Sequence, residues 1–201
     1  MSRPTPDTRT RILDSAWKML ESGTEVRMAD IAKSAGISRQ ALYLHFPARA
    51  ELLIATTRHI DEKKNIEARL ASSRNAETGI DQLNAYIEAW GNYIPEIHGV
   101  ARALMALQDS DAAAKLAWED RMHAVREGCE AAIKALRNDG VLSSDYTISK
   151  ATDILWAMLS VGQWELLTVT CGWSQSQYIK LTKVIACRTL LNQQTYQMSR
   201  N

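Results

Sequence analysis

The sequence predicts an all-α protein with a small three-helix N-terminal domain and a larger C-terminal helical bundle. The 201 residues include only 4 Pro and 9 Gly, so few positions interrupt a helix. Runs of β-branched residues are absent, and apolar residues recur every three or four positions, as the buried face of a helix requires. A chain of this length can form one ordinary domain, or a small domain joined to a moderate one.

Three short helices are expected in the N-terminal region, over residues 7–21, 28–35 and 39–45. Gly23 and Gly36 follow the first two as stops, because glycine tolerates the left-handed backbone that commonly ends a helix. The hydroxyl of Ser38 can cap the third helix. That helix must end before Pro47, because the residue preceding a proline disfavours the helical conformation.

Longer helices are expected in the rest of the chain. A fourth helix covers about residues 47–70, and the polar residues 72–79 form the best linker. Pro95 is expected to close or kink the next helix, and Gly140 to follow the end of a later one. These helices cover residues 80–94, 97–107 and 118–136. The last two are expected over residues 149–171 and 174–197, with a break at Gly172 and Trp173.

Cysteine usage and the N-terminal residues suggest a cytoplasmic protein. Cys129, Cys171 and Cys187 are far apart, odd in number and form no CxxC pair, which suits a reducing compartment. No apolar stretch follows the charges of residues 1–7, so no signal peptide is expected. Residues 154–173 are long enough for a membrane span but contain several polar side chains, so a buried helix is favoured.

Residues 30–46 have the pattern of a helix-turn-helix. Gly36 permits the turn, alanines on the first helix allow close packing, and Ile37 and Leu42 fill the small core. The second helix presents a face rich in hydrogen-bond donors, while Leu42 and Phe46 are expected to face inward. A short helix with such a face fits the major groove of DNA.

The charge distribution agrees with this interpretation once it is divided along the chain. The whole sequence has 24 Lys and Arg against 23 Asp and Glu, a formal net charge of +1. Residues 1–49 hold eight basic and five acidic residues, a balance of +3, whereas residues 50–201 hold 16 and 18, a balance of −2. A modestly basic N-terminal region predicts salt-sensitive DNA binding at one end of the molecule.

Four short motifs in the first fifty residues occur at a specific spacing. They are Ile12-Leu13-Asp14, Asp30-Ile31-Ala32, Ala35-Gly36-Ile37-Ser38 and Tyr43-Leu44-His45-Phe46. Together they resemble the tetracycline-repressor (TetR) family over residues 9–53. The resemblance implies a DNA-binding domain over residues 1–49. It also implies a ligand-binding and dimerisation domain over residues 50–201, in which residues 50–71 form a connecting helix, and repression that a small molecule relieves.

Under this resemblance eight residues are predicted to contact DNA: Arg27, Ser38, Arg39, Gln40, Tyr43, Leu44, His45 and Arg49. Arg39 and Gln40 can read base edges, while Leu44 offers an apolar contact to a thymine methyl group. Arg49 stands where a phosphate-contacting lysine is common in the family. Arg27 and Ala48 replace hydroxyl residues that usually cap the second and fourth helices, which removes about 1 kcal/mol each. Arg27 suits a direct phosphate contact instead.

The C-terminal region is predicted to bind a small hydrophobic or aromatic effector. Five of the six tryptophans lie there, and large rings around a cavity suit such a ligand, although core or interface packing is the alternative for each ring. The predicted pocket residues are Trp90, Tyr93, Met105, Trp118, Met122, His123 and Gln163. The alternative to an effector-controlled regulator is a DNA-binding protein that a partner protein controls, with no small-molecule effector.

A homodimer is also predicted, because the apolar helix expected over residues 149–171 needs a second surface to cover it. The last two predicted helices match the family's usual dimerisation pair, and two-fold symmetry implies a palindromic operator. The predicted interface residues are Trp156, Leu159, Trp164, Leu167, Leu181, Val184, Ile185 and Leu191.

An enzyme is not expected. The Glu-x-x-His pairs of a di-iron bundle, glycine-rich phosphate loops and the Gly-x-Ser-x-Gly elbow are all absent from the sequence. Glu119 and His123 lie one helical turn apart but lack further ligands, so they are interpreted as a surface pair. The sequence therefore predicts no catalytic residue, no metal site and no cofactor.

Overall fold

The computed structural model describes residues 7–23 and 26–198, and within these ranges it is helical and contains no β-strand. The expectation about a signal peptide rests on the first residues of the chain, of which 1–6 lie outside this part. The elements are α1 (Thr8–Glu21), α2 (Met28–Ser34), α3 (Arg39–His45), α4 (Arg49–Lys63), α5 (Ile66–Arg74), α6 (Gly79–Leu107), α7 (Ala112–Asn138), α8 (Ile148–Met158), α9 (Val161–Glu165), the π-helix η1 (Leu166–Thr170), α10 (Gln175–Leu190) and α11 (Gln193–Met198). The all-α prediction is confirmed.

The chain folds into two compact units. Unit 1 contains residues 1–65 and 97–122, and unit 2 contains residues 66–96 and 123–201. The predicted domains, residues 1–49 and 50–201, are defined by function, whereas the two units are defined by packing. The boundary at residue 49 therefore stays a prediction. Among the described residues, no helix combines the length and apolar character needed to cross a bilayer.

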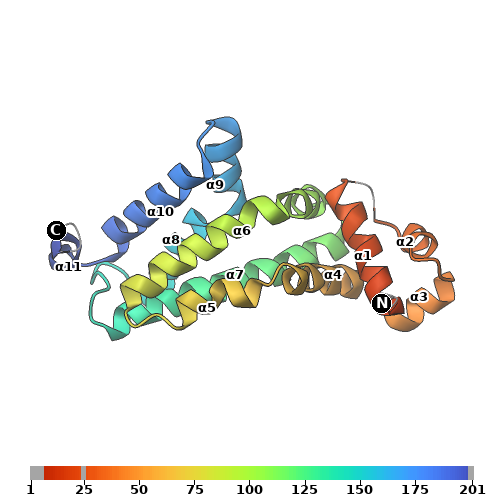
Figure 1. The fold of residues 1–201 in the computed structure, drawn as a ribbon, viewed down its shortest axis with the longest axis horizontal. Coiled ribbons are helices and arrows are strands. Elements are labelled where there is room, and N and C mark those ends of the chain that lie inside the picture. The colour runs from red at the N-terminus through yellow and green to blue at the C-terminus, as the bar shows by residue number, and fades with distance from the viewer. Residues whose placement is uncertain (1–6, 24–25, 199–201) are drawn as a thin grey trace, which may run out of the picture. The chain divides into compact units, whose positions relative to one another are not determined.

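Unit 1 is built around α1, which packs against α2 and α4, while α2 packs against α3 (Figure 1). Ile12 of α1, Ile31 of α2, Leu42 of α3 and Leu52 of α4 are fully buried together. The same core includes side chains from the later helices α6 and α7: Val100, Leu104, Ala114 and Ala117. Residues that are distant in the sequence therefore complete the core of the N-terminal helices.

The N-terminal helices begin and end close to the predicted positions. Asp7 caps α1 by accepting a hydrogen bond from the amide of Thr10 at 2.6 Å, and Gly36 adopts a positive φ of 68° after α2. The single helix predicted over residues 47–70 is wrong, because α4 ends at Lys63 and α5 begins at Ile66. Asn65 lies at the break with φ 55°, a conformation that asparagine tolerates better than most residues.

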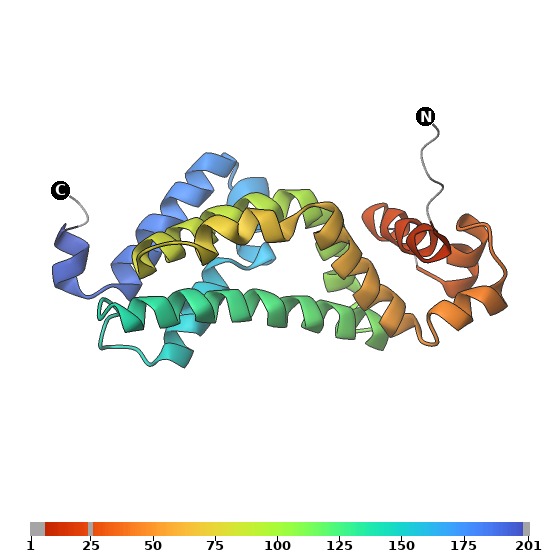
Figure 2. The same ribbon diagram turned by 60° about the horizontal axis from the view of Figure 1, so that its bottom comes forward.

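One of the two sequence expectations is that the helix ends at Pro95, and this expectation is wrong because α6 continues past it. Proline lacks the N–H that would donate to the carbonyl four residues earlier, which is that of Gly91. In the structure this carbonyl accepts a hydrogen bond from Nε2 of Gln175 at 2.8 Å. Because a side chain of α10 supplies the missing donor, α6 continues to Leu107. Figures 1 and 2 both show α10 beside the first part of α6.

The helix predicted over residues 149–171 is wrong because it breaks between α8 and α9. The side chain of Ser160 caps α9 by accepting a hydrogen bond from the amide of Gln163 at 3.2 Å. The carbonyl of Leu159 accepts a hydrogen bond from Nε1 of Trp90 at 2.9 Å. Side chains therefore provide hydrogen-bond partners for a carbonyl at the end of α8 and for an amide at the start of α9. The helix predicted over residues 174–197 is also interrupted, at Leu191, whereas the predicted break at Gly172 is confirmed.

Gly79, where α6 passes the end of α7, gives a stability prediction. A Cβ at Gly79 would lie 2.6 Å from the amide nitrogen of Leu136 and 2.7 Å from the carbonyl carbon of Ala135. Because these are backbone atoms, we expect Gly79→Ala to lower the free energy of unfolding by about 1–3 kcal/mol. A Cβ at Gly162 in α9 would meet no atom within 4 Å. Gly162→Ala should raise the free energy of unfolding by roughly 0.5–1 kcal/mol. Equal urea midpoints for the two variants would contradict the close contact.

Candidate nucleic-acid interface

Helix α3 has one buried and one exposed face, as predicted. The side chain of Ser38 caps the helix by accepting a hydrogen bond from the amide of Ala41 at 3.1 Å. Leu42 is 0% exposed and Phe46 3%, whereas Leu44 is 82% exposed. The buried residues fix the helix against α2 and the unit 1 core, so the opposite face is held toward solvent.

The exposed face of α3 carries most of the predicted DNA contacts. Arg39, Gln40 and His45 are exposed, and Tyr43 is 43% exposed. Their side chains offer guanidinium, amide, imidazole and phenol groups within two turns of a helix narrow enough for the major groove. The structure brings these residues together on one surface, and their contact with DNA stays a prediction.

One further cation lies near the end of α3 and is not among the predicted DNA contacts. The guanidinium carbon of Arg9 in α1 lies 5.0 Å from the centre of the Phe46 ring, at the end of α3. This distance is within the range of a cation–π contact. The pairing depends on how α1 crosses α3, which residue spacing alone does not determine.

The two predicted departures from the usual capping pattern are confirmed. Arg27 and Ala48 occupy the N-cap positions of α2 and α4, and neither makes a side-chain capping hydrogen bond. Arg27 is exposed at the start of α2, where backbone N–H groups and the helix dipole favour an anion. This position is compatible with the predicted phosphate contact.

Arg49 differs from the other predicted contacts because it has partners inside unit 1. Its Nε donates a hydrogen bond to the carbonyl of Val26 at 2.6 Å, and its Nη1 donates to Oδ2 of Asp111 in an ion pair. The side chains of Arg49 and Asp111 are 24% and 22% exposed, respectively. The guanidinium is therefore held by the protein itself.

The predicted pocket residues are divided between the two units. Trp90, Tyr93, His123 and Gln163 belong to unit 2, whereas Met105, Trp118 and Met122 belong to unit 1. Trp90 and Tyr93 are buried, with ring centres 5.8 Å apart. The ring of Trp118 packs against the unit 1 core. Packing alone accounts for these rings, and the pocket stays a prediction.

His123 is a surface residue in unit 2. Its side chain is 73% exposed, and its Nε2 lies 3.3 Å from Oε1 of Glu127, whereas Glu119 pairs with Lys115. The pairing of His123 with Glu119 expected from the sequence is therefore wrong in its partner. Nowhere in the described part of the chain do three His, Cys, Asp or Glu residues converge as metal ligands would.

The predicted dimer residues have different exposures within unit 2. Leu159 is 0% exposed, Leu191 4% and Trp164 7%, so these three side chains pack inside the protomer rather than on its surface. Ile185 is 37% exposed, and the remaining predicted residues are half-buried: Trp156, Leu167, Leu181 and Val184. The predicted interface residues do not include Leu166 and Val169 of η1, whose side chains are 56% and 59% exposed. A π-helix shifts the register of side chains, which apolar spacing cannot predict.

The fold and the exposed face of α3 define a helix-turn-helix DNA-binding protein. Residues 12–56 match the family described as bacterial regulatory proteins, tetR family. The HTH-type transcriptional repressor LfrR of Mycolicibacterium smegmatis is 25% identical over 155 residues, which cover 77% of each protein. Residues 12–56 are therefore similar to the tetR family, and most of the chain is similar to a transcriptional repressor.

Solved structures show the same fold. A putative transcriptional regulator from Saccharomonospora viridis, in complex with choline, matches with a TM-score of 0.70 and 17% identity. That match covers 92% of this chain and 98% of the other. The structure described as the SmeT–triclosan complex matches with a TM-score of 0.66 and 18% identity, and 92% of each chain is covered.

Proposed function

We propose that this protein is a cytoplasmic repressor that binds a palindromic operator as a homodimer. The observation that supports this proposal best is the face of α3, where Leu44 is 82% exposed beside exposed Arg39 and Gln40. On this face the guanidinium and amide groups can bond to base edges, while the leucine side chain can contact a thymine methyl group. The similarity to LfrR, whose name describes a repressor, favours repression.

The experiment that tests this function is selection of bound fragments from the genome that encodes the chain, followed by a gel-shift assay. We expect one or a few fragments that contain an inverted repeat, bound with a strong dependence on salt concentration. A reporter placed behind such a fragment should fall in activity when the protein is expressed. Binding to every fragment with equal affinity, or a rise in reporter activity, would contradict the proposal.

The proposed dimer uses apolar residues that unit 2 leaves exposed, among them Leu166 and Val169 of η1 and Ile185 of α10. We expect Leu166→Glu to shift the protein from dimer to monomer in sedimentation at micromolar concentration, because burying an unpaired charge at an interface is costly. Leu116→Glu in α7 is a matched control, since Leu116 is 50% exposed and lies outside unit 2. A monomeric unmodified protein would contradict the homodimer.

The proposed effector is a small hydrophobic or aromatic compound. Support comes from related folds whose structures are described with a small molecule, choline or triclosan, bound. A compound of this class should quench tryptophan fluorescence, raise the melting temperature and release the selected operator fragment. Release by a partner protein, without a response to any compound in a broad hydrophobic library, would support protein control instead.

A further inference from the structure

Arg49 connects three elements of unit 1. It is the first residue of α4, its Nε is bonded to the carbonyl of Val26 just before α2, and its Nη1 is bonded to Asp111 just before α7. Val26 is 1% exposed, so the segment that leads into α2 is itself fixed in the core. One guanidinium thus joins the start of α4, the segment that leads into α2 and the start of α7.

Asp111 is placed to hold this guanidinium firmly. Its Oδ1 accepts hydrogen bonds from the amides of Ala113 at 3.0 Å and Ala114 at 3.2 Å, so it caps α7, while its Oδ2 accepts from Arg49. Burial by itself would raise the pKa of Asp111, but the hydrogen bonds from Arg49 and Ala114 outweigh burial and lower that pKa below its usual value. The carboxylate is therefore ionised at neutral pH.

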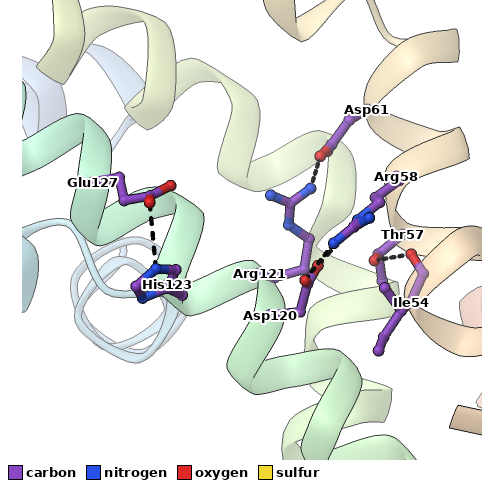
Figure 3. Close-up of polar contacts among 8 residues, drawn as sticks. All are labelled: Ile54, Thr57, Arg58, Asp61, Asp120, Arg121, His123 and Glu127. Carbon is purple, nitrogen blue, oxygen red and sulfur yellow. Dashed lines mark hydrogen bonds and ion pairs between the residues drawn. The ribbon is translucent and has the colours of Figure 1, made fainter. Parts of the chain in front are cut away.

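Two further ion pairs join α4 to α7 in the same unit. Arg58 donates to Asp120 through Nη2 at 2.6 Å, and Arg121 donates to Asp61 (Figure 3). The first pair has its arginine on α4, whereas the second has its arginine on α7. Both pairs therefore place opposite charges against each other where α4 meets α7.

We propose that Asp111 is a positioning residue for DNA binding, and that Arg49 acts through Asp111 and Val26 rather than as a phosphate contact. The contacts of Arg49 with Val26 and Asp111, here called the Arg49 bridge, fix the start of α4 relative to α2. Because α3 lies between α2 and α4 in the chain, the bridge also fixes how α3 is presented to DNA. Both side chains are about three-quarters buried, so the bridge is screened less by solvent than a surface pair. This inference rests on the proposed operator binding.

The test compares Arg49→Lys and Asp111→Asn on the operator fragment selected above. A phosphate contact predicts that Arg49→Lys keeps its affinity, since lysine preserves the charge. It also predicts that Asp111→Asn binds more tightly, since a negative charge is removed and Arg49 is released. The positioning role predicts the opposite sign, with both variants about three- to tenfold weaker and the double variant no weaker than either single one. Asparagine retains an oxygen that can cap α7, so this variant is expected to fold.

Glu119→Gln is the matched control, because Glu119 is on α7 and its ion pair is with Lys115 of the same helix. We expect this variant to bind within twofold of the unmodified protein. The slope of affinity against salt should be the same for Arg49→Lys and the unmodified protein, since the number of cations is unchanged. Tighter binding by Asp111→Asn, or unchanged binding by Arg49→Lys, would overturn the inference. If the unmodified protein selects no operator, the proposed function fails instead.

Discussion

Leu42→Ala should lower the stability of the protein and Leu44→Ala should leave it nearly unchanged, although both remove the same atoms from the same two-turn helix. Leu42 is 0% exposed in the unit 1 core, so its truncation leaves a cavity and should lower the free energy of unfolding by about 2–5 kcal/mol. Leu44 is 82% exposed, so its truncation should change the free energy of unfolding by less than about 0.5 kcal/mol.

Operator affinity separates the two variants further. Leu44→Ala should weaken binding by about 1 kcal/mol and reduce the preference for thymine over uracil at one operator position, because only thymine carries the methyl group. Denaturant titration and gel shifts with uracil-substituted fragments measure both effects. Equal loss of stability in the two variants would show that α3 is not oriented as described. An unchanged thymine preference in Leu44→Ala would remove the proposed base contact.

Arg39→Ala should weaken operator binding by about 1–3 kcal/mol and relax specificity at one base pair. Arg39 is exposed at the first position of α3, where a guanidinium can form two hydrogen bonds to guanine. Replacement by lysine should recover part of the affinity but less of the specificity, because lysine cannot offer the same planar pair of donors. A selection of randomised operators by each variant measures the change.

Arg27→Ala also removes an exposed arginine and is the comparison for Arg39→Ala. Arg27 is exposed at the start of α2, so we expect a phosphate contact that weakens binding almost uniformly across sequences when it is lost. The slope of log affinity against log salt should fall by about 1. An unchanged affinity and salt slope would exclude Arg27 from the interface, and a sequence-selective loss would assign it to base reading instead.

Local signals predicted the DNA-binding elements well, because their boundaries depend on neighbouring residues. Helix α3 covers Arg39–His45 as predicted, since the Ser38 cap and Pro47 both act within one turn. Two of the errors occur where a distant side chain decides the outcome. Gln175 satisfies the carbonyl that Pro95 leaves without a donor, and Trp90 satisfies the carbonyl at the α8–α9 break. Neither contact is visible in residue spacing.

The same distinction holds for the candidate site. Exposure of the α3 residues followed from an amphipathic pattern, which specifies the outer face once the inner face is known. The partners of Arg49 did not follow, because Asp111 lies 62 positions away and meets Arg49 only when α4 packs against α7. The apolar pattern of the last helices predicted a broad surface but did not distinguish buried Leu159 from exposed Leu166, because the helix breaks between them.

The composition of the unit 1 core has a consequence for how the protein is made in the cell. Val100, Leu104, Ala114 and Ala117 share the core with α1 and α4, so the N-terminal helices leave the ribosome well before their packing partners exist. At typical rates of synthesis, the interval between residues 65 and 122 lasts about 3–11 s. Until then apolar surface on α1 and α4 stays exposed to chaperones and proteases, and the core that supports α3 is complete only when the middle of the chain has been translated.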